Sequence, residues 1–307
     1  MMQQQLIIDE IHKKNEQYLK ELADRIATGN SVIPFIGAGM SCPIYGTWGE
    51  YLDAIIPVAD EAGHRILKQQ LEEGHYDDAA QNIQNEYGNG FFNYTAEYFS
   101  VEKIKMDLVS NAARLLPQLF QGPMLTTNLD RVIEAIYAQE GIQMEVVLAD
   151  NPNLIQALTR DGAVCLWKIH GDIINRESWI VTKEAYTKQY GSKSKRPFQE
   201  CLEKILERKV LLFLGCSLES DFIVKILKDI CKQNPYIIHY AVLPVKNGYR
   251  FQQNDIDVFN LRNKQLGRMG VNPIFYPDGE YECVAEYLRR LLELIPTGSK
   301  LKKNRQF

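Results

Sequence analysis

The feature that most constrains the fold of this chain is a short apolar run that ends in glycines, at residues 32–41. The run reads Val-Ile-Pro-Phe-Ile-Gly-Ala-Gly-Met-Ser. A continuous apolar segment of this kind is typical of a strand that is covered on both faces, as in a parallel sheet. Glycines at its end allow close backbone approach to an anionic oxygen, which the N–H groups of the turn favour. The run therefore predicts an α/β fold with a phosphate-binding turn after its first strand.

This motif by itself leaves alternatives open. The dinucleotide fingerprint Gly-x-Gly-x-x-Gly would need glycine at position 42, where this chain has Cys42, and the absence of a following Gly-Lys-Ser/Thr excludes the ATP-type phosphate loop. A tight turn between two buried elements would use the same glycines. Ser41 could hydrogen-bond a phosphate, or it could cap the next helix.

Short apolar segments alternate with helical patterns along the rest of the chain. Strands are predicted at 31–36, 123–126, 145–148, 163–169, 209–215, 237–243 and 271–276, and helices at 5–28, 130–140, 195–207, 219–232 and 281–294. Only helices are predicted from about 48 to 118. This alternation predicts an α/β fold with a Rossmann-like doubly wound, mainly parallel sheet and an inserted helical module.

The predicted organisation is one large domain with two appendages. We expect an N-terminal helix within residues 1–30, a nucleotide-binding domain over 31–296 with its helical insertion at about 48–118, and a basic flexible tail over 297–307. Solvated, frayed termini of this composition are common, so the tail carries no argument for a ligand.

Composition excludes several classes of protein. Of the 307 residues, 45% are hydrophobic and 24% are charged, and the net charge of -4 gives no electrostatic case for binding nucleic acid or a membrane surface. No apolar run is long enough to span a membrane, and the first residues lack the basic and then apolar pattern of a secretion signal. The six cysteines form no Cys-x-x-Cys pair. We therefore expect a cytoplasmic protein with reduced thiols and no zinc ribbon.

Three later segments share the design of the first, an apolar strand followed by small or polar residues. In open α/β sheets ligands bind outside the carboxyl ends of the strands. Asn128 can donate and accept, which suits a ribose diol or a catalytic water, whereas Asp130 could simply cap the following helix. His170 is a candidate general base, with a structural histidine as the alternative, and the other four histidines are predicted to be structural. Gly215 and Ser217 end the fourth such strand.

The order of these motifs is more specific than any one of them. Gly-Ala-Gly-x-Ser, Thr-Thr-Asn-x-Asp, His-Gly-Asp and Leu-Gly-x-Ser follow one another along the chain. In this order the sequence resembles the sirtuin superfamily, and more closely the sirtuin-like NAD-cleaving domains of bacterial antiphage defence systems. The resemblance runs over about residues 30–295. It includes the segment 179–186, where a short strand and a tyrosine-bearing helix follow the histidine in that branch.

The resemblance implies roles for particular residues. Asn128 would hold the nicotinamide ribose and position water, and His170 would be the catalytic base. The residues implied to bind the nucleotide are Gly37, Ala38, Gly39, Ser41, Thr127, Asp130, Gly215, Ser217 and Tyr276. Tyr276 lies in the segment 275–280, where the family closes over adenine.

The implied activity is NAD glycohydrolysis, with NAD as the substrate and no metal. Deacylases of the superfamily carry a four-cysteine zinc module between the His-Gly and Leu-Gly-x-Ser motifs. In this chain the corresponding interval, residues 172–213, contains one cysteine, Cys201. Protein deacylation is therefore not expected. A non-catalytic NAD- or ADP-ribose-binding regulatory subunit and an ADP-ribosyl transferase stay open as alternatives.

Regulation follows from the same resemblance. A free NAD hydrolase would drain its own cell, so we expect a regulated effector that depletes NAD in antiphage defence. Its control would rest on a homo-oligomer or on a separate partner chain, such as a sensor or an ATPase.

Overall fold

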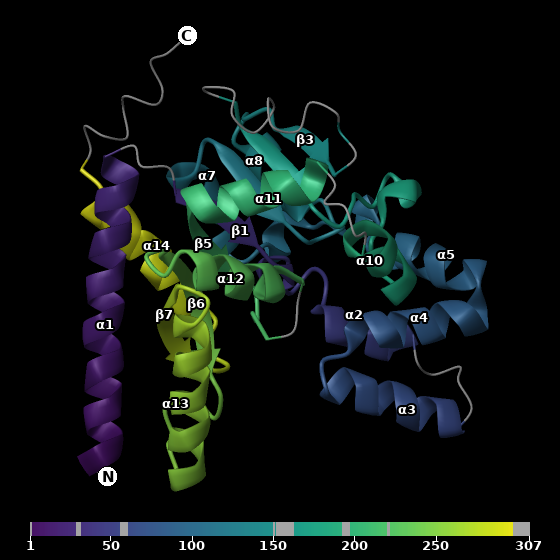
Figure 1. Ribbon diagram of the computed structural model, residues 1–307. Coiled ribbons are helices and arrows are strands. Elements are labelled where there is room, and N and C mark those ends of the chain that lie inside the picture. Colours follow the sequence, from purple (N-terminus) through teal and green to yellow (C-terminus); the bar gives the residue numbers. More distant parts are fainter. Residues whose placement is uncertain are drawn as a thin grey trace. The chain divides into compact units, whose positions relative to one another are not determined.

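The computed structural model describes residues 2–28, 32–55, 61–149, 151, 163–191, 197–219 and 222–296 (Figure 1). Its strands are β1 (Val32–Ile36), β2 (Pro123–Thr126), β3 (Glu145–Leu148), β4 (Cys165–Lys168), β5 (Val210–Leu214), β6 (His239–Val245) and β7 (Val271–Pro277). Each end of each strand lies within two residues of its predicted position. The predicted tail at 297–307 falls outside the described residues.

The strands form one seven-stranded sheet in the order β3-β4-β2-β1-β5-β6-β7. The β3–β4, β5–β6 and β6–β7 pairs are parallel. On one side of β1 lie β2, β4 and β3, and on the other lie β5, β6 and β7. Strands added on both sides of the first strand are the signature of a doubly wound sheet. The predicted Rossmann-like α/β fold is therefore confirmed.

The helices are α1 (Met2–Ala27), α2 (Trp48–Ile55), α3 (Glu61–Glu72), α4 (Tyr76–Tyr87), α5 (Asn89–Tyr98), α6 (Asn111–Arg114), α7 (Leu116–Leu119), α8 (Val132–Gln139), α10 (Lys183–Tyr190), α11 (Pro197–Arg208), α12 (Phe222–Gln233), α13 (Gln253–Gly267) and α14 (Glu282–Leu294). The described residues between β1 and β2 form helices and turns only, so the inserted helical module is confirmed. None of the helices in the described part of the chain is long and apolar enough to cross a membrane.

Two details differ from the sequence-based expectations. Helix α13 was not predicted, because its apolar residues do not fall on one face: Ile256 and Leu266 are buried, whereas Val258 and Leu261 are exposed. The short strand expected at the start of the segment 179–186 is wrong, since no strand is assigned there in the described residues. The Ile180 N–H donates to the His170 carbonyl at 2.9 Å, but this contact does not continue as a strand pairing. The tyrosine-bearing helix of that segment is α10.

The chain divides into two compact units. Unit 1 comprises Met1–Phe35, Asn111–Met124 and Glu203–Phe307, and unit 2 comprises Ile36–Ser110 and Leu125–Leu202. The division passes through β1 and β2. Each unit has its own buried apolar residues, and each is described by itself below.

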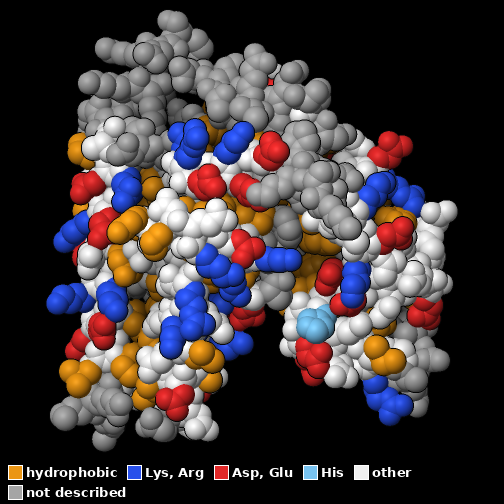
Figure 2. Space-filling model, in the orientation of Figure 1, with side chains coloured by type: hydrophobic (Ala, Val, Ile, Leu, Met, Phe, Trp, Pro, Cys, Tyr) orange, Lys and Arg blue, Asp and Glu red, His pale blue; other side chains and the backbone are white. Residues whose placement is uncertain are grey.

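In unit 1, helix α1 packs against α14 and β7 (Figure 1). Its buried apolar residues are Ile11, Leu19, Leu22, Ala23 and Ile26. The buried Asn15 side chain donates to the Phe275 carbonyl at 2.7 Å and accepts from the Phe275 N–H at 2.9 Å. Acidic and basic side chains are interspersed along the outer face of α1, where Lys14 pairs with Glu10 (Figure 2). Asn15 thus satisfies backbone groups on the outer edge of β7, the last strand of the sheet among the described residues.

In unit 2, the helical module is built around aromatic side chains. Tyr51 of α2 is fully buried, and its ring lies 5.0 Å from the rings of both Tyr98 and Phe99. Helix α4 of the module packs against α10. Thr182 caps α10 by accepting a hydrogen bond from the Ala185 N–H. The module therefore supports the helix that follows His170 in the chain.

Candidate active site

The ends of β1, β2 and β4 are joined by hydrogen bonds within unit 2. The Thr126 hydroxyl donates to the Ile36 carbonyl at 2.8 Å. The Ile169 N–H donates to the Thr126 carbonyl at 2.8 Å. Three of the four motifs predicted from sequence therefore start from one connected edge of the sheet.

The glycine turn after β1 is a short 3-10 helix, Ala38–Met40, rather than the start of a long α-helix. Gly37 has φ of -107° and ψ of 179°, an extended conformation that any residue adopts. Its backbone angle therefore does not require glycine, and the sequence-based reason, close approach of a ligand, remains. Ser41 is not the cap of an α-helix, because the next one, α2, begins at Trp48.

Asn128 is held by three hydrogen bonds, one to the end of its own strand β2 and two to the segment after β1. Its backbone N–H donates to the Thr126 hydroxyl at 3.0 Å. Its side-chain Nδ2 donates to the Gly37 carbonyl and to Ser41 Oγ, both at 3.1 Å. Because a carbonyl only accepts, these contacts fix which end of the amide is nitrogen. The Asn128 carbonyl oxygen Oδ1 is thus the atom of this side chain that can accept from a water or a ribose hydroxyl.

Asp130 lies one residue before Arg131, the N-cap of α8, and its carboxylate contacts both the first N–H of that helix and Ser41. Its Oδ1 accepts from the Val132 N–H at 3.0 Å, at the start of α8. The Ser41 hydroxyl, 2% exposed, lies 3.0 and 2.9 Å from the two carboxylate oxygens. Burial raises the pKa of Asp130, and the nearby Lys168 charge offsets part of that rise. A chain of contacts therefore runs from Asp130 through Ser41 to Asn128. The nucleotide role of Thr127, which lies half-buried beside Asn128, stays a prediction.

His170 lies two residues beyond the end of β4. Its Nδ1 is 3.2 Å from the Tyr186 hydroxyl on α10, and the two rings meet edge to face at 5.0 Å. The next residue, Gly171, has φ of +97°, and a Cβ there would collide with the Ser178 carbonyl. Glycine is therefore required at 171 by both conformation and space, which fixes the direction in which the chain leaves His170.

A cluster of buried charges lies beside these residues. Lys168 is 0% exposed, and its ammonium donates to the Leu129 and Asp130 carbonyls at 3.0 and 2.6 Å and to Glu134 Oε1 at 3.0 Å. Arg131 forms a bidentate pair with Asp172, with a shortest contact of 2.7 Å. Sequence reasoning missed this cluster, although a lysine inside the apolar run Cys-Leu-Trp-Lys-Ile was a signal for it.

Two carboxyl groups of the cluster titrate differently. Burial tends to raise the pKa of Asp172, but the Arg131 hydrogen bonds and the Lys168 charge outweigh burial and hold that pKa below its ordinary value. Burial raises the pKa of Glu134, and Lys168 only partly opposes the rise. Asp172 is therefore the firmly ionised member.

The remaining predicted residues lie in unit 1. Gly215 directly follows β5, and its φ of +69° lies in the left-handed region. Leu218, the residue after Ser217, also has a positive φ, of +53°. Arg262 of α13 donates to the carbonyls of Ser217 and Leu218. Tyr276 lies on β7 with its ring edge-on to Tyr281, and burial raises the pKa of Tyr276 to about 12. The structure thus orders the loop that carries Ser217, and the nucleotide contacts of these residues stay predictions.

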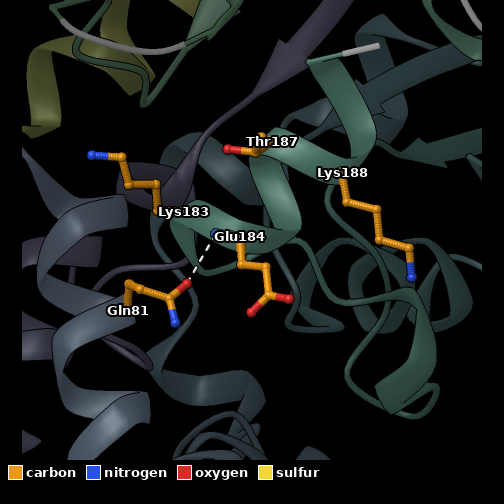
Figure 3. Close-up of a pocket in the computed structure, with 5 residues that line it drawn as sticks. All are labelled: Gln81, Lys183, Glu184, Thr187 and Lys188. Carbon is orange, nitrogen blue, oxygen red and sulfur yellow. Dashed lines mark hydrogen bonds between the residues drawn. The ribbon is translucent and has the colours of Figure 1, made fainter.

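A shallow surface hollow of about 540 Å³ in unit 2 is lined by Gln81, Lys183, Glu184, Thr187 and Lys188 (Figure 3). Four of these side chains come from α10, and Gln81 of α4 accepts from the Glu184 N–H at 2.9 Å. None of the predicted site residues lines it. Across the described residues, no three His, Cys, Asp or Glu side chains are grouped as metal ligands would be.

The sequence is similar to those of known proteins. A family model described as a SIR2-like domain matches residues 123–267, which include Asn128, His170 and Ser217. The NAD(+) hydrolase ThsA of Enterococcus faecium is 30% identical over 217 residues, 69% of this chain and 42% of that protein. The protein of the same name from Cytobacillus dafuensis is 26% identical over 193 residues, 59% of this chain and 38% of that protein. The aligned part therefore spans about two fifths of each relative.

Proposed function

This chain carries a SIR2-like domain, and on that premise we propose that it is an NAD glycohydrolase. The reaction joins NAD and water and yields nicotinamide, ADP-ribose and a proton. Both relatives are named NAD(+) hydrolases, which supports NAD as the substrate. Because this chain aligns with only about two fifths of each relative, the activity of the whole relative is not transferred and hydrolysis stays a proposal for this chain.

The chemistry asks little covalent work of the protein. Nicotinamide leaves as a neutral molecule, so it needs no proton, while positive charge builds on the ribose as in glycoside hydrolysis. The protein must hold the ribose, exclude bulk water and place one water at the anomeric carbon. Asn128 Oδ1 accepts from that water or from a ribose hydroxyl, and His170 takes the proton that is released.

One observation carries the proposal: Asn128 and His170 follow the ends of neighbouring strands that are hydrogen-bonded at that point. The Ile169 N–H to Thr126 carbonyl bond lies one residue before His170 and two before Asn128. An amide and an imidazole fixed on the same strand edge are the pair that the reaction requires. The Gly37 turn, which Asn128 contacts directly, supplies the adjoining position for the pyrophosphate.

The test is nicotinamide release from NAD by the purified protein and by two variants, His170→Ala and Asn128→Ala. Positioned acid–base catalysis contributes about 10²–10⁴-fold, so each variant should lose activity by that factor while remaining folded. His75→Ala, which changes an exposed histidine, is the matched control. Wild-type turnover in a folded His170→Ala or Asn128→Ala protein would overturn the assignment.

The other readings appear as different outcomes of the same assay. ADP-ribose found on protein instead of free in solution would identify a transferase. If calorimetry shows that the protein binds ADP-ribose, and the protein cleaves no NAD either by itself or in lysate, it is a regulatory subunit.

We also propose that the activity is held off until a trigger arrives, as befits an effector that depletes NAD in antiphage defence. The control would come through a homo-oligomer or a separate partner chain. Release that occurs only when lysate from phage-infected cells is added would support this control. Full activity of the dilute purified monomer would exclude it.

A further inference from the structure

The proposed reaction makes no use of Lys168, although this side chain is fully buried two residues before His170. Lysine is almost never fully buried unless it is paired. Its ammonium reaches across from β4 to the loop after β2 and binds the carbonyl oxygens of Leu129 and Asp130. Leu129 is the residue directly after Asn128. Lys168 thus links the loop of one proposed catalytic residue to the strand of the other.

A second link runs in the opposite direction. Arg131, on the loop after β2, holds Asp172, on the loop after β4, by hydrogen bonds of 3.0 and 2.7 Å. The Ile173 N–H donates to the Leu129 carbonyl at 3.0 Å. The two links lie on either side of His170, at Lys168 and Asp172, whereas in the loop after β2 both follow Asn128 directly, at residues 129–131.

Stability alone is a poor reason for such a cluster. Removing ions from water costs several kcal/mol each, and well-packed apolar residues often replace a buried ion pair with no loss of stability. Geometry is a better reason, because each donor binds named atoms of the opposite loop and a shift of either loop would break those contacts. A displacement of 1 Å at a catalytic group can cost about 100-fold in rate.

We propose that Lys168, together with the Arg131–Asp172 pair, is a positioning device that sets Asn128 and His170 in register for the reaction. This inference rests on the proposed function. Lys168 touches the carbonyls beside Asn128 and acts through them, so it is a positioning residue and takes no part in proton transfer.

The experiment separates positioning from charge balance. Lys168→Met removes the ammonium and leaves the partly buried Glu134 carboxylate with only the more distant Arg131 guanidinium, 3.7 Å away, among the described cations. The double variant Lys168→Met with Glu134→Gln removes that carboxylate charge as well, so its melting temperature should recover. If Lys168 only balanced charge, turnover would recover with it. Positioning through the carbonyls predicts that kcat stays lower by about 100-fold in the folded double variant, with a smaller change in KM.

A second readout does not depend on activity. With all five histidines labelled with ¹⁵N and the His170 signals assigned from His170→Ala, the double variant should shift the His170 ring signals and leave the other four unchanged. Lys183→Met, which removes an exposed ion pair with Asp78 in the same unit, is the control and should leave every signal and kcat unchanged. If neither Lys168 variant folds, Arg131→Gln tests the opposite link, because that side chain is 27% exposed.

The outcomes are distinct. Unchanged His170 signals and unchanged kcat in the folded double variant would overturn the positioning role. A wild-type protein that cleaves no NAD under any condition would refute the proposed function, while the ring signals would still decide whether Lys168 sets the position of His170.

Discussion

The carboxyl ends of the strands are held by different forces in the two units. In unit 2, the segments after β2 and β4 are joined by buried ions, among them Lys168 and Asp172 at 0% and 2% exposure. In unit 1, β6 and β7 stay paired in parallel over seven residues, from His239 opposite Val271 to Val245 opposite Pro277, and the edge is completed by one neutral amide, Asn15. Burying an ion carries a desolvation cost in free energy, whereas pairing two apolar parallel strands does not. Costly contacts therefore lie where the catalytic pair is proposed.

The largest expected effect is the loss of one ion from the buried cluster. Arg131→Met leaves the buried Asp172 carboxylate with the Ile174 N–H and with a more distant cation, Lys168, 3.7 Å away. We therefore expect a loss of about 3 kcal/mol in the free energy of unfolding. Urea titration measures it. Lys183→Met, at an exposed ion pair, should give no measurable change. If Arg131→Met and Lys183→Met changed the free energy of unfolding equally, burial would not determine the effect of losing an ion, and the contrast drawn between buried and exposed charges would be wrong.

The units also differ in their response to acid. In unit 1, burial lowers the pKa of His239 to about 4, against 6.5 for a free histidine. Between these values the unfolded chain binds a proton that the native chain does not, so stability falls as pH falls from about 6.5 to 4. The contribution should be about 2 kcal/mol between pH 7 and pH 4.5.

The difference between wild type and His239→Gln isolates this effect, since Asp130 and Glu134, whose pKa values are raised, titrate in both proteins. The contribution of Asp130 and Glu134 to the pH dependence of stability has the opposite sign. Because their pKa values are raised by folding, the native state binds more protons than the unfolded state as pH falls, and stability rises. A wild-type protein that loses no more stability than His239→Gln on acidification would show that His239 is not held neutral by burial.

The smallest expected effect on stability is at an uncharged hydrogen bond in unit 1, between Asn15 and Phe275. Asn15→Ala removes the partner of the buried Phe275 N–H and should cost about 1–2 kcal/mol in unfolding free energy. Specific activity per folded molecule should stay at the wild-type value. Gln17→Ala on the exposed face of the same helix is the control. A large fall in kcat for folded Asn15→Ala would contradict the view that only unit 2 holds the catalytic pair in register.

Much of the fold could be predicted because its signals are local. An apolar run such as Val32–Ile36 is buried wherever it is placed in a sheet, and its pattern of buried residues agrees with this. Helix α13 could not be predicted, because apolar Val258 and Leu261 face solvent and spoil the helical periodicity. Periodicity reports one buried face, and α13 does not have a clean one.

By itself, the sequence determined the seven strands, the inserted helices and the order of the motifs that carry Asn128 and His170. The tertiary structure alone decided how those residues are held: that Ser41 bridges Asp130 and Asn128, and that Lys168 crosses to the carbonyl of Leu129. The physical reason is range. Apolar periodicity acts along the chain, whereas a buried charge takes its partner from whichever segment the fold brings within about 3 Å, 39 residues away in the case of Lys168 and Leu129.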